Sequence, residues 1–408
     1  MLAALTAGAG LSAQVPVVKE TTASAREQLY RRLVQRSIQQ NLSLPLSDST
    51  EEQWITAFET LALLRYRSPW TTARLEQSFD RIPERSEAYQ YALLSLISAS
   101  HPSPLSAKID QLYKGTVYPK AIAGCAALLT GQQKTDPKKI SADACRRIEE
   151  TGDSLTAAVL HRYLTNREQH LSRAQLRELL FHPFPGKRPV VFSLQRQNRN
   201  YPGVAIVRDT SGKFLIQKNL LFSVPQLARG LYNLPAILTN GNTPQGIFRM
   251  QGTAVSRINF IGPTPNLQLS MPAETPVGTF LGDSTITDSS WTEARYLGLL
   301  PPSCRNMKAL MQTYDAGRMG RTEIIAHGTT INPEYYKGEP YYPQTPTMGC
   351  LCTKEIWNSE TGARQESDQQ KLVDALALAG GTDGYLVVIE LDNQEAPVSI
   401  TELEALIR

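Results

Sequence analysis

The sequence has few of the residues that bind metals and few long apolar runs. Its 408 residues include five cysteines and five histidines, and the four histidines before residue 190 lack the spacing of metal ligands. Beyond the first residues, no apolar stretch reaches the length that a membrane-spanning helix needs. We therefore expect no metal, no cofactor and no membrane span.

Neither sign of charge is in large excess. The formal net charge is +4, and no basic run alternates with aromatic residues as in many nucleic-acid-binding proteins. Nucleic acid is therefore not an expected partner. With 41% hydrophobic and 20% charged residues the composition is that of a globular protein, and the length exceeds one typical core. These values predict two domains.

The N-terminal segment suggests export. Leu2–Ala13 is small and apolar and resembles the end of a signal peptide, so residues 1–13 are interpreted as a possible signal-peptide remnant. The first basic residue is Lys19, so a merely apolar terminus is the alternative. No cysteine follows that would indicate a lipid anchor. The expected location is periplasmic or secreted.

Residues 20–183 are expected to form an all-helical domain. Apolar residues recur at helical spacing, and Ser, Thr, Asp and Pro separate the segments. Helices of similar length with short turns favour paired-helix packing, although no fixed repeat is present. The predicted helices are Ala25–Gln40, Glu51–Tyr66, Thr71–Phe79, Glu87–Ser98, Ala107–Tyr113, Tyr118–Leu129, Ala142–Glu150, Ser154–Leu164 and Arg173–Phe181.

After a Pro-rich boundary at 182–189 the pattern changes to strands and turns. We expect residues 190–408 to form a mostly β domain, so the fold class is α+β with the helical domain first. The predicted strands are Val190–Arg196, Gly203–Val207 and Lys213–Gln217, and the predicted helices are Ser223–Leu231 and Asp368–Ala379.

One cysteine has a histidine as a candidate base. His327, the only histidine after residue 182, lies 23 positions before Cys350. It ends a β-type segment, Arg321–Ala326, and a loop rich in Tyr and Pro follows. An imidazole commonly activates a cysteine thiol, so the pair is a candidate nucleophile and base. The alternative is a buried thiol and an unrelated histidine.

The other four cysteines allow several interpretations. Cys125 and Cys145 either form a bridge between two helices or are two separate thiols. Cys352 is too close to Cys350 along an extended segment for an unstrained bridge, so it is either packed or adjacent to substrate. Cys304 has no obvious mate.

Four segments in order resemble the L,D-transpeptidase catalytic domain, a family of cysteine peptidoglycan transpeptidases. The likeness covers about residues 190–393 and includes an expected insertion at about 252–302 that would form a lid or extra strands. Met348 stands where the family usually has a second histidine, and Cys352 where it often has Arg or Asn. The segments are Asn242–Phe248, His327–Thr329, Thr347–Cys350 and Gly381–Ile389.

The resemblance implies roles for these residues. Cys350 would be the nucleophile, His327 the base, and the main-chain carbonyl of Gly328 would orient the imidazole. Backbone N–H groups around Met348, Gly349 and Cys350 would form the oxyanion site, with Thr347 holding the turn. The candidate substrate contacts are Thr329, Tyr341, Tyr342 and Cys352, although packing beneath the loop is an equal alternative for the tyrosines.

The implied substrates are peptidoglycan stem peptides. The enzyme would take the acyl group of a tetrapeptide, release D-alanine and pass the acyl group to an amine; a carbapenem could acylate the same cysteine. Hydrolysis by the same pair, as an L,D-carboxypeptidase or endopeptidase, is an alternative. A non-catalytic cell-wall-binding protein is another.

Overall fold

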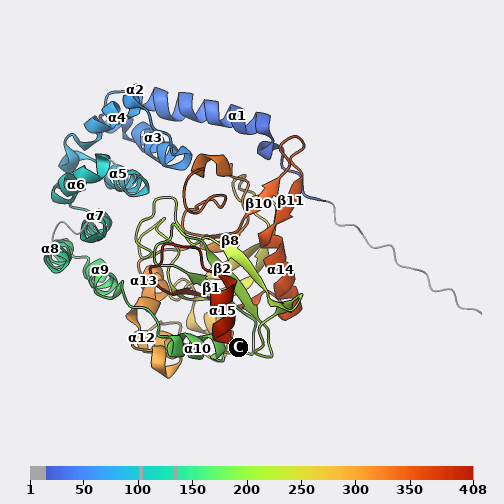
Figure 1. Cartoon of the computed structure of the whole chain (residues 1–408). Helices are drawn as coiled ribbons and strands as arrows, with labels where there is room; N and C mark the ends of the chain where they lie inside the picture. The colour runs from blue at the N-terminus through green and yellow to red at the C-terminus, as the bar shows by residue number, and fades with distance from the viewer. Residues whose placement is uncertain (1–14, 101–103, 132–135, 408) are drawn as a thin grey trace, which may run out of the picture.

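The computed structural model describes residues 15–100, 104–131 and 136–407. Its N-terminal helices follow one another in an arc around a β domain (Figure 1). Each helix predicted between residues 25 and 181 is present, although α8 begins at Pro137 rather than Ala142. The helices are α1 (Ala23–Arg32), continued by the π-helical η2 (Leu33–Gln40), α2 (Asn41–Ser43), α3 (Glu51–Leu64), α4 (Pro69–Glu76), α5 (Glu87–Ala99), α6 (Ile109–Gly115), α7 (Pro119–Gly131), α8 (Pro137–Glu149), α9 (Ser154–Asn166) and α10 (Arg173–Phe181).

Local capping explains where several helices begin. The Ser68 side chain accepts a hydrogen bond from the Thr71 amide at 3.1 Å, and Pro69 occupies the first helical position of α4. Asp153 caps α9 in the same way through the Thr156 amide. These polar caps satisfy amides that the helix itself leaves without acceptors.

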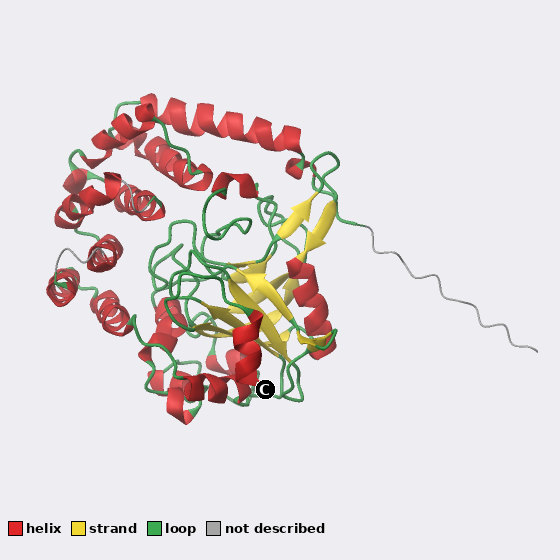
Figure 2. Ribbon diagram, in the orientation of Figure 1, coloured by secondary structure: helices red, strands yellow, loops and turns green. Residues whose placement is uncertain are grey.

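The arc is packed against two loops of the β domain. Its apolar core contains Trp54 and Phe58 of α3 and Leu94 of α5, all buried. The same core continues into residues 227–238 and into Tyr336 and Tyr341. Figure 2 shows loops lying between the helices and the strands. The helical arc and these loops of the β domain therefore form one continuous hydrophobic core.

The β domain is built on one curved, mixed sheet. The strand order is β5-β2-β1-β12-β6-β7-β8-β9; β1 pairs with β12, and β8 with β9, in parallel, and the other pairs are antiparallel. Leu227, just after β5, exchanges two hydrogen bonds of 2.8 Å with Cys352 of β9, so the sheet nearly closes on itself. The strands are β1 (Val190–Gln195), β2 (Gly203–Arg208), β5 (Ser223–Gln226), β6 (Gly246–Ala254), β7 (Asn266–Ser270), β8 (Ile325–His327), β9 (Leu351–Cys352) and β12 (Asp383–Glu390).

Helices cover both faces of the sheet. On one face α14 (Asp368–Ala379), predicted with the same bounds, packs against strand residues that include Phe248, Ala326 and Leu351. The other face is covered by α10 and by three further helices. These are α11 (Val277–Leu281), α12 (Glu293–Leu297) and α15 (Ile400–Ile407), while α13 (Gln312–Arg318) lies along β6.

One prediction about the β domain is wrong, and the structure decides between the alternatives of another. Ser223–Leu231 is not a helix: β5 pairs with β2 at the sheet edge, where the missing N–H of Pro225 is tolerated, and a loop follows. For 252–302, the alternatives were a lid or extra strands. This segment supplies a strand of the main sheet, β7, together with α11 and α12.

Two small hairpins extend the domain, β3 (Ile216–Gln217) with β4 (Leu220–Leu221) and β10 (Glu355–Trp357) with β11 (Arg364–Ser367). The start of the arc joins the second hairpin, because the Val18 amide donates to the Gly362 carbonyl at 2.8 Å. The predicted signal-peptide remnant lies outside the described residues.

All five cysteines are free thiols, so Cys125 of α7 and Cys145 of α8 form no bridge. In the part of the chain that the structure describes, no helix combines the length and apolarity needed to cross a bilayer.

Candidate active site

Adjacent parallel strands carry the candidate base and nucleophile. His327 ends β8, and Cys350 immediately precedes β9. Ala326 pairs with Leu351, and both side chains point into the core under α14. His327 is registered with Cys352, two residues after Cys350. The fold therefore brings the segment that ends at His327 beside the segment that begins at Cys350.

The His327 ring is held in a defined orientation. Its Nδ1 lies 2.5 Å from the Gly328 carbonyl oxygen, which only accepts, so Nδ1 carries the proton and Nε2 the lone pair. The side chain is 4% exposed, and this burial lowers the pKa of His327 to about 4. At neutral pH the ring is uncharged and its Nε2 can accept a proton.

The backbone that follows His327 is clamped by the β10 strand. The Thr329 amide donates to the Glu355 carboxylate at 3.0 Å, and the Trp357 indole donates to the Thr329 carbonyl at 2.9 Å. A Cβ at Gly328 would lie 2.3 Å from the Glu355 carboxyl carbon, so this position has room only for glycine. Glu355 therefore fixes the carbonyl that orients the imidazole.

The Cys350 thiol bonds to backbone, not to the imidazole. Its Sγ accepts from the Ile325 amide at 3.5 Å and lies 3.7 Å from the Glu323 carbonyl oxygen. Among the described residues no hydrogen bond joins it to His327. Burial raises the pKa of the Cys350 thiol, while the Ile325 N–H and the Arg321 charge oppose that effect. Cys350 is half-buried, whereas Gly349 and Leu351 on either side of it are buried.

The turn before Cys350 is held by the Thr347 hydroxyl. It donates to the Cys350 carbonyl at 2.8 Å and accepts from the Gly349 amide at 3.1 Å. The Gly349 N–H, predicted for the oxyanion site, is therefore already bonded to this hydroxyl. The Met348 and Cys350 amides have no acceptor among the described residues, so they are the donors that can face an oxyanion.

Two residues that support this turn were not predicted. The buried Thr243 hydroxyl donates to the Gly349 carbonyl at 2.9 Å. The Arg321 guanidinium packs against Gly349, where an added Cβ would lie 2.0 Å from its Nη2. Gly349 also has φ of +109°, which disfavours any side chain. Thr243 lies in a segment that the sequence singled out, whereas nothing in the sequence distinguished Arg321.

Three of the candidate substrate contacts are buried; for Tyr341 and Cys352 the structure shows the packing alternative. Tyr341 is fully buried beneath the arc, with the Arg229 guanidinium 4.8 Å from its ring centre. Cys352 is also fully buried, because it pairs with the loop after β5. Thr329 is 4% exposed, and its hydroxyl accepts from Thr345 at 3.1 Å. None of the three side chains is available to a substrate.

Two side chains near the turn remain accessible. Tyr342 is 39% exposed, and its hydroxyl donates to Glu334 at 2.8 Å. Met348 is 49% exposed and lies immediately before the Gly349–Cys350 pair.

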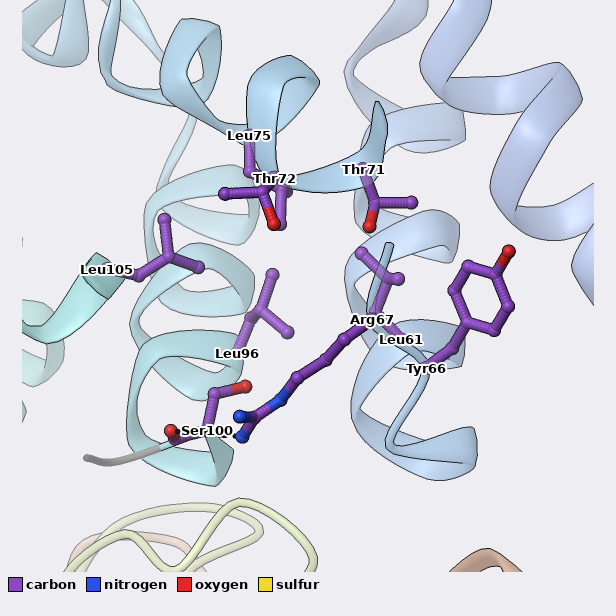
Figure 3. Close-up of a pocket in the computed structure, with 9 residues that line it drawn as sticks. All are labelled: Leu61, Tyr66, Arg67, Thr71, Thr72, Leu75, Leu96, Ser100 and Leu105. Carbon is purple, nitrogen blue, oxygen red and sulfur yellow. Dashed lines mark hydrogen bonds between the residues drawn. The ribbon is translucent and has the colours of Figure 1, made fainter. Parts of the chain in front are cut away.

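A separate pocket of about 60 Å³ lies within the helical arc, between α3, α4 and α5 (Figure 3). The Arg67 side chain extends across it toward Ser100, whose carbonyl accepts its Nη2 at 3.5 Å. This pocket contains no residue of the β8–β9 region. Its lining residues are Leu61, Tyr66, Arg67, Thr71, Thr72, Leu75, Leu96, Ser100 and Leu105.

No group of three or more His, Cys, Asp or Glu side chains within the described ranges could hold a metal ion. The chain matches no protein-family model, no curated protein and no solved structure.

Proposed function

We propose that the chain is a cysteine acyltransferase of the L,D-transpeptidase type that acts on peptidoglycan stem peptides. The observation that supports this most is the His327 ring, oriented by the Gly328 carbonyl and uncharged, on the strand that pairs with the segment following Cys350. The free Met348 and Cys350 amides add donors for an oxyanion at the same turn. An exported location follows from the proposed substrate.

The reaction begins with proton transfer from the Cys350 thiol to His327 Nε2. The sulfur attacks the carbonyl carbon of the stem peptide, and the resulting oxyanion is stabilised by the Met348 and Cys350 amides. Collapse breaks the peptide bond, and the departing D-alanine amine takes the proton from His327. An acceptor amine then attacks the thioester. His327 takes a proton from that amine and passes it to the sulfur as the C–S bond breaks, which restores the thiol and the neutral imidazole.

The resting thiol must turn before this reaction. Its Sγ is held by the Ile325 amide and the Glu323 carbonyl, so a rotation about the Cα–Cβ bond of Cys350 is needed to direct it toward His327. Catalytic hydrogen bonds are often absent before substrate binds. We infer that the bound peptide stabilises the rotated position.

Two alternatives have their own support. Hydrolysis of the same bond, as an L,D-carboxypeptidase or endopeptidase, uses the same residues with water in place of the amine. A non-catalytic wall-binding role is favoured by the missing hydrogen bond between Cys350 and His327. In that case the helical arc would be the surface that binds the cell wall.

Intact-mass measurement after incubation with a carbapenem tests the proposal. We expect one covalent adduct on the full chain, mapped to Cys350 and absent from Cys350→Ala. Cys352→Ala is the matched control, since that thiol is buried, and it should retain the adduct. No adduct together with unchanged tetrapeptide muropeptides would exclude catalysis. Muropeptide dimers would indicate transfer, and shortened stems would indicate hydrolysis.

A further inference from the structure

Arg321 is a buried cation without an acidic partner. Its side chain is 4% exposed, and within the described residues no carboxylate forms an ion pair with it. Its guanidinium donates instead to three carbonyls, those of Ala236, Gly241 at 2.8 Å and Asn242 at 2.8 Å. Burying a charge is costly unless an opposite charge or strong hydrogen bonds compensate for it.

Cys350 is the group next to Arg321 that can supply a negative charge. The Nη2 of Arg321 occupies the space where Gly349 would carry a side chain, one residue before Cys350. The backbone between Arg321 and β8 also reaches the thiol, through the Glu323 carbonyl and the Ile325 amide. The cation therefore packs against the turn that carries the sulfur.

In the described part of the chain, no other ionisable group near the thiol supplies a positive charge that would stabilise its thiolate form. His327 is uncharged at neutral pH, as its lowered pKa of about 4 implies, so no imidazolium is present to pair with a thiolate. Glu323 opposes a thiolate through its negative charge, and burial raises the pKa of Cys352 to about 12. Tyr91, which faces Arg321 from α5, is a neutral phenol because burial raises its pKa.

We propose that Arg321 is a positioning residue whose positive charge stabilises the thiolate form of Cys350. The inference rests on the proposed role of Cys350 as nucleophile. It assigns charge stabilisation to Arg321 and proton transfer to His327, two tasks that a single imidazole performs in many cysteine enzymes.

The arc holds this cation in place. The carbonyls that bind Arg321 belong to residues 236–242, and Leu238 of this loop is buried in the shared core. The Tyr91 hydroxyl of α5 donates to the Thr239 carbonyl at 2.7 Å. Through this loop the helical part of the chain reaches the turn that carries the nucleophile.

The test is the pH dependence of Cys350 alkylation by iodoacetamide in the full chain. Fragment-ion mass spectrometry separates Cys350 from Cys352, which share one tryptic peptide. The rate follows the thiolate fraction, so Arg321→Met should shift the Cys350 titration upward by about one unit and slow alkylation at pH 7 about tenfold. Arg321→Lys keeps the charge and should lie within half a unit of the parent, about threefold in rate.

A second buried arginine provides the matched control. Arg208 of β2 is also 4% exposed and donates to backbone carbonyls, those of Leu180 and His182. Arg208→Met should lose a similar amount of stability and leave the Cys350 titration unchanged. An unchanged titration in Arg321→Met, or the same shift in Arg208→Met, would overturn the proposal.

If Arg321→Met does not fold, Arg321→Lys decides the question. A shift of more than one unit despite the retained charge would refute an electrostatic role. Because alkylation needs no peptide substrate, this result is independent of acyl transfer. A chain that forms no carbapenem adduct but shows the Arg321-dependent titration would refute the proposed function and keep this inference.

Discussion

The hydroxyl of Thr243 donates a hydrogen bond to the carbonyl of Gly349 across 106 residues of sequence. Both groups are buried, and the bond joins the loop before β6 to the turn that ends at Cys350. It ties two of the segments that the sequence singled out into one structural unit. The candidate nucleophile therefore depends on a residue that does not touch it.

Replacing Thr243 by valine should impair the site more than its size change suggests. The Gly349 carbonyl would lose its buried donor, at a cost of about 1–3 kcal/mol in unfolding free energy. The carbapenem acylation rate should fall because the turn is no longer held. Urea denaturation and the adduct rate measure the two effects. Thr243→Ser keeps the hydroxyl and should retain most of the acylation rate; an equal loss in both variants would contradict this role.

Acid should destabilise the protein partly through His327. Its folded-state pKa of about 4 lies below the ordinary value of 6.5. Between these values the unfolded chain binds a proton that the folded chain excludes, so stability falls as pH decreases from 6.5 to 4. The full effect is about 3 kcal/mol.

Comparison of the parent chain with His327→Gln isolates this contribution. Urea denaturation at pH 7 and pH 4 should show the variant losing less stability on acidification than the parent does. Equal losses would mean that the His327 pKa is not lowered in the folded state.

Two neighbouring tyrosines should respond differently to substitution. The buried Tyr341 hydroxyl has no hydrogen-bond partner among the described residues, so Tyr341→Phe should be neutral or stabilising by up to about 1 kcal/mol. Tyr341→Ala should cost about 3–5 kcal/mol through the lost core volume. For the exposed Tyr342, the change to Phe should stay within about 0.5 kcal/mol. A rise in KM with unchanged stability in Tyr341→Phe would restore the substrate-contact interpretation.

The shared core predicts that the two parts unfold together. Leu238 is 1% exposed in the core that spans the arc and the β domain, so Leu238→Ala should cost about 2–5 kcal/mol. Far-UV circular dichroism and tryptophan fluorescence should report one coincident unfolding transition in the parent protein and in Leu238→Ala. Leu376→Ala, in the core beneath α14, is the control for a cavity elsewhere. Two separated transitions would show that the parts are independent.

The helices could be predicted because each carries its own periodicity and caps. The same holds for α14, whose predicted bounds agree with the structure. The helix predicted at Ser223–Leu231 was wrong. A short edge strand that contains Pro225 has too few residues to show the alternation typical of a strand, and its partner β2 lies elsewhere in the sequence.

The candidate site was predictable only as far as local motifs extend. His327, Gly328 and Cys350 stand in recognisable segments. Arg321 could not be identified, since its position depends on carbonyls some 80 residues earlier in the chain. For Tyr341 the sequence could not decide between packing and substrate contact, because the helices that cover it are distant in sequence.

The shared core also has a consequence for synthesis of the chain. The arc emerges from the ribosome first, but its core includes Tyr336 and Tyr341, near the other end of the sequence. Until those residues are made, the apolar inner side of α3 and α5 is incompletely covered, and nascent chains with such surfaces associate readily. The protein should therefore depend on chaperones during translation more than its final compact state suggests.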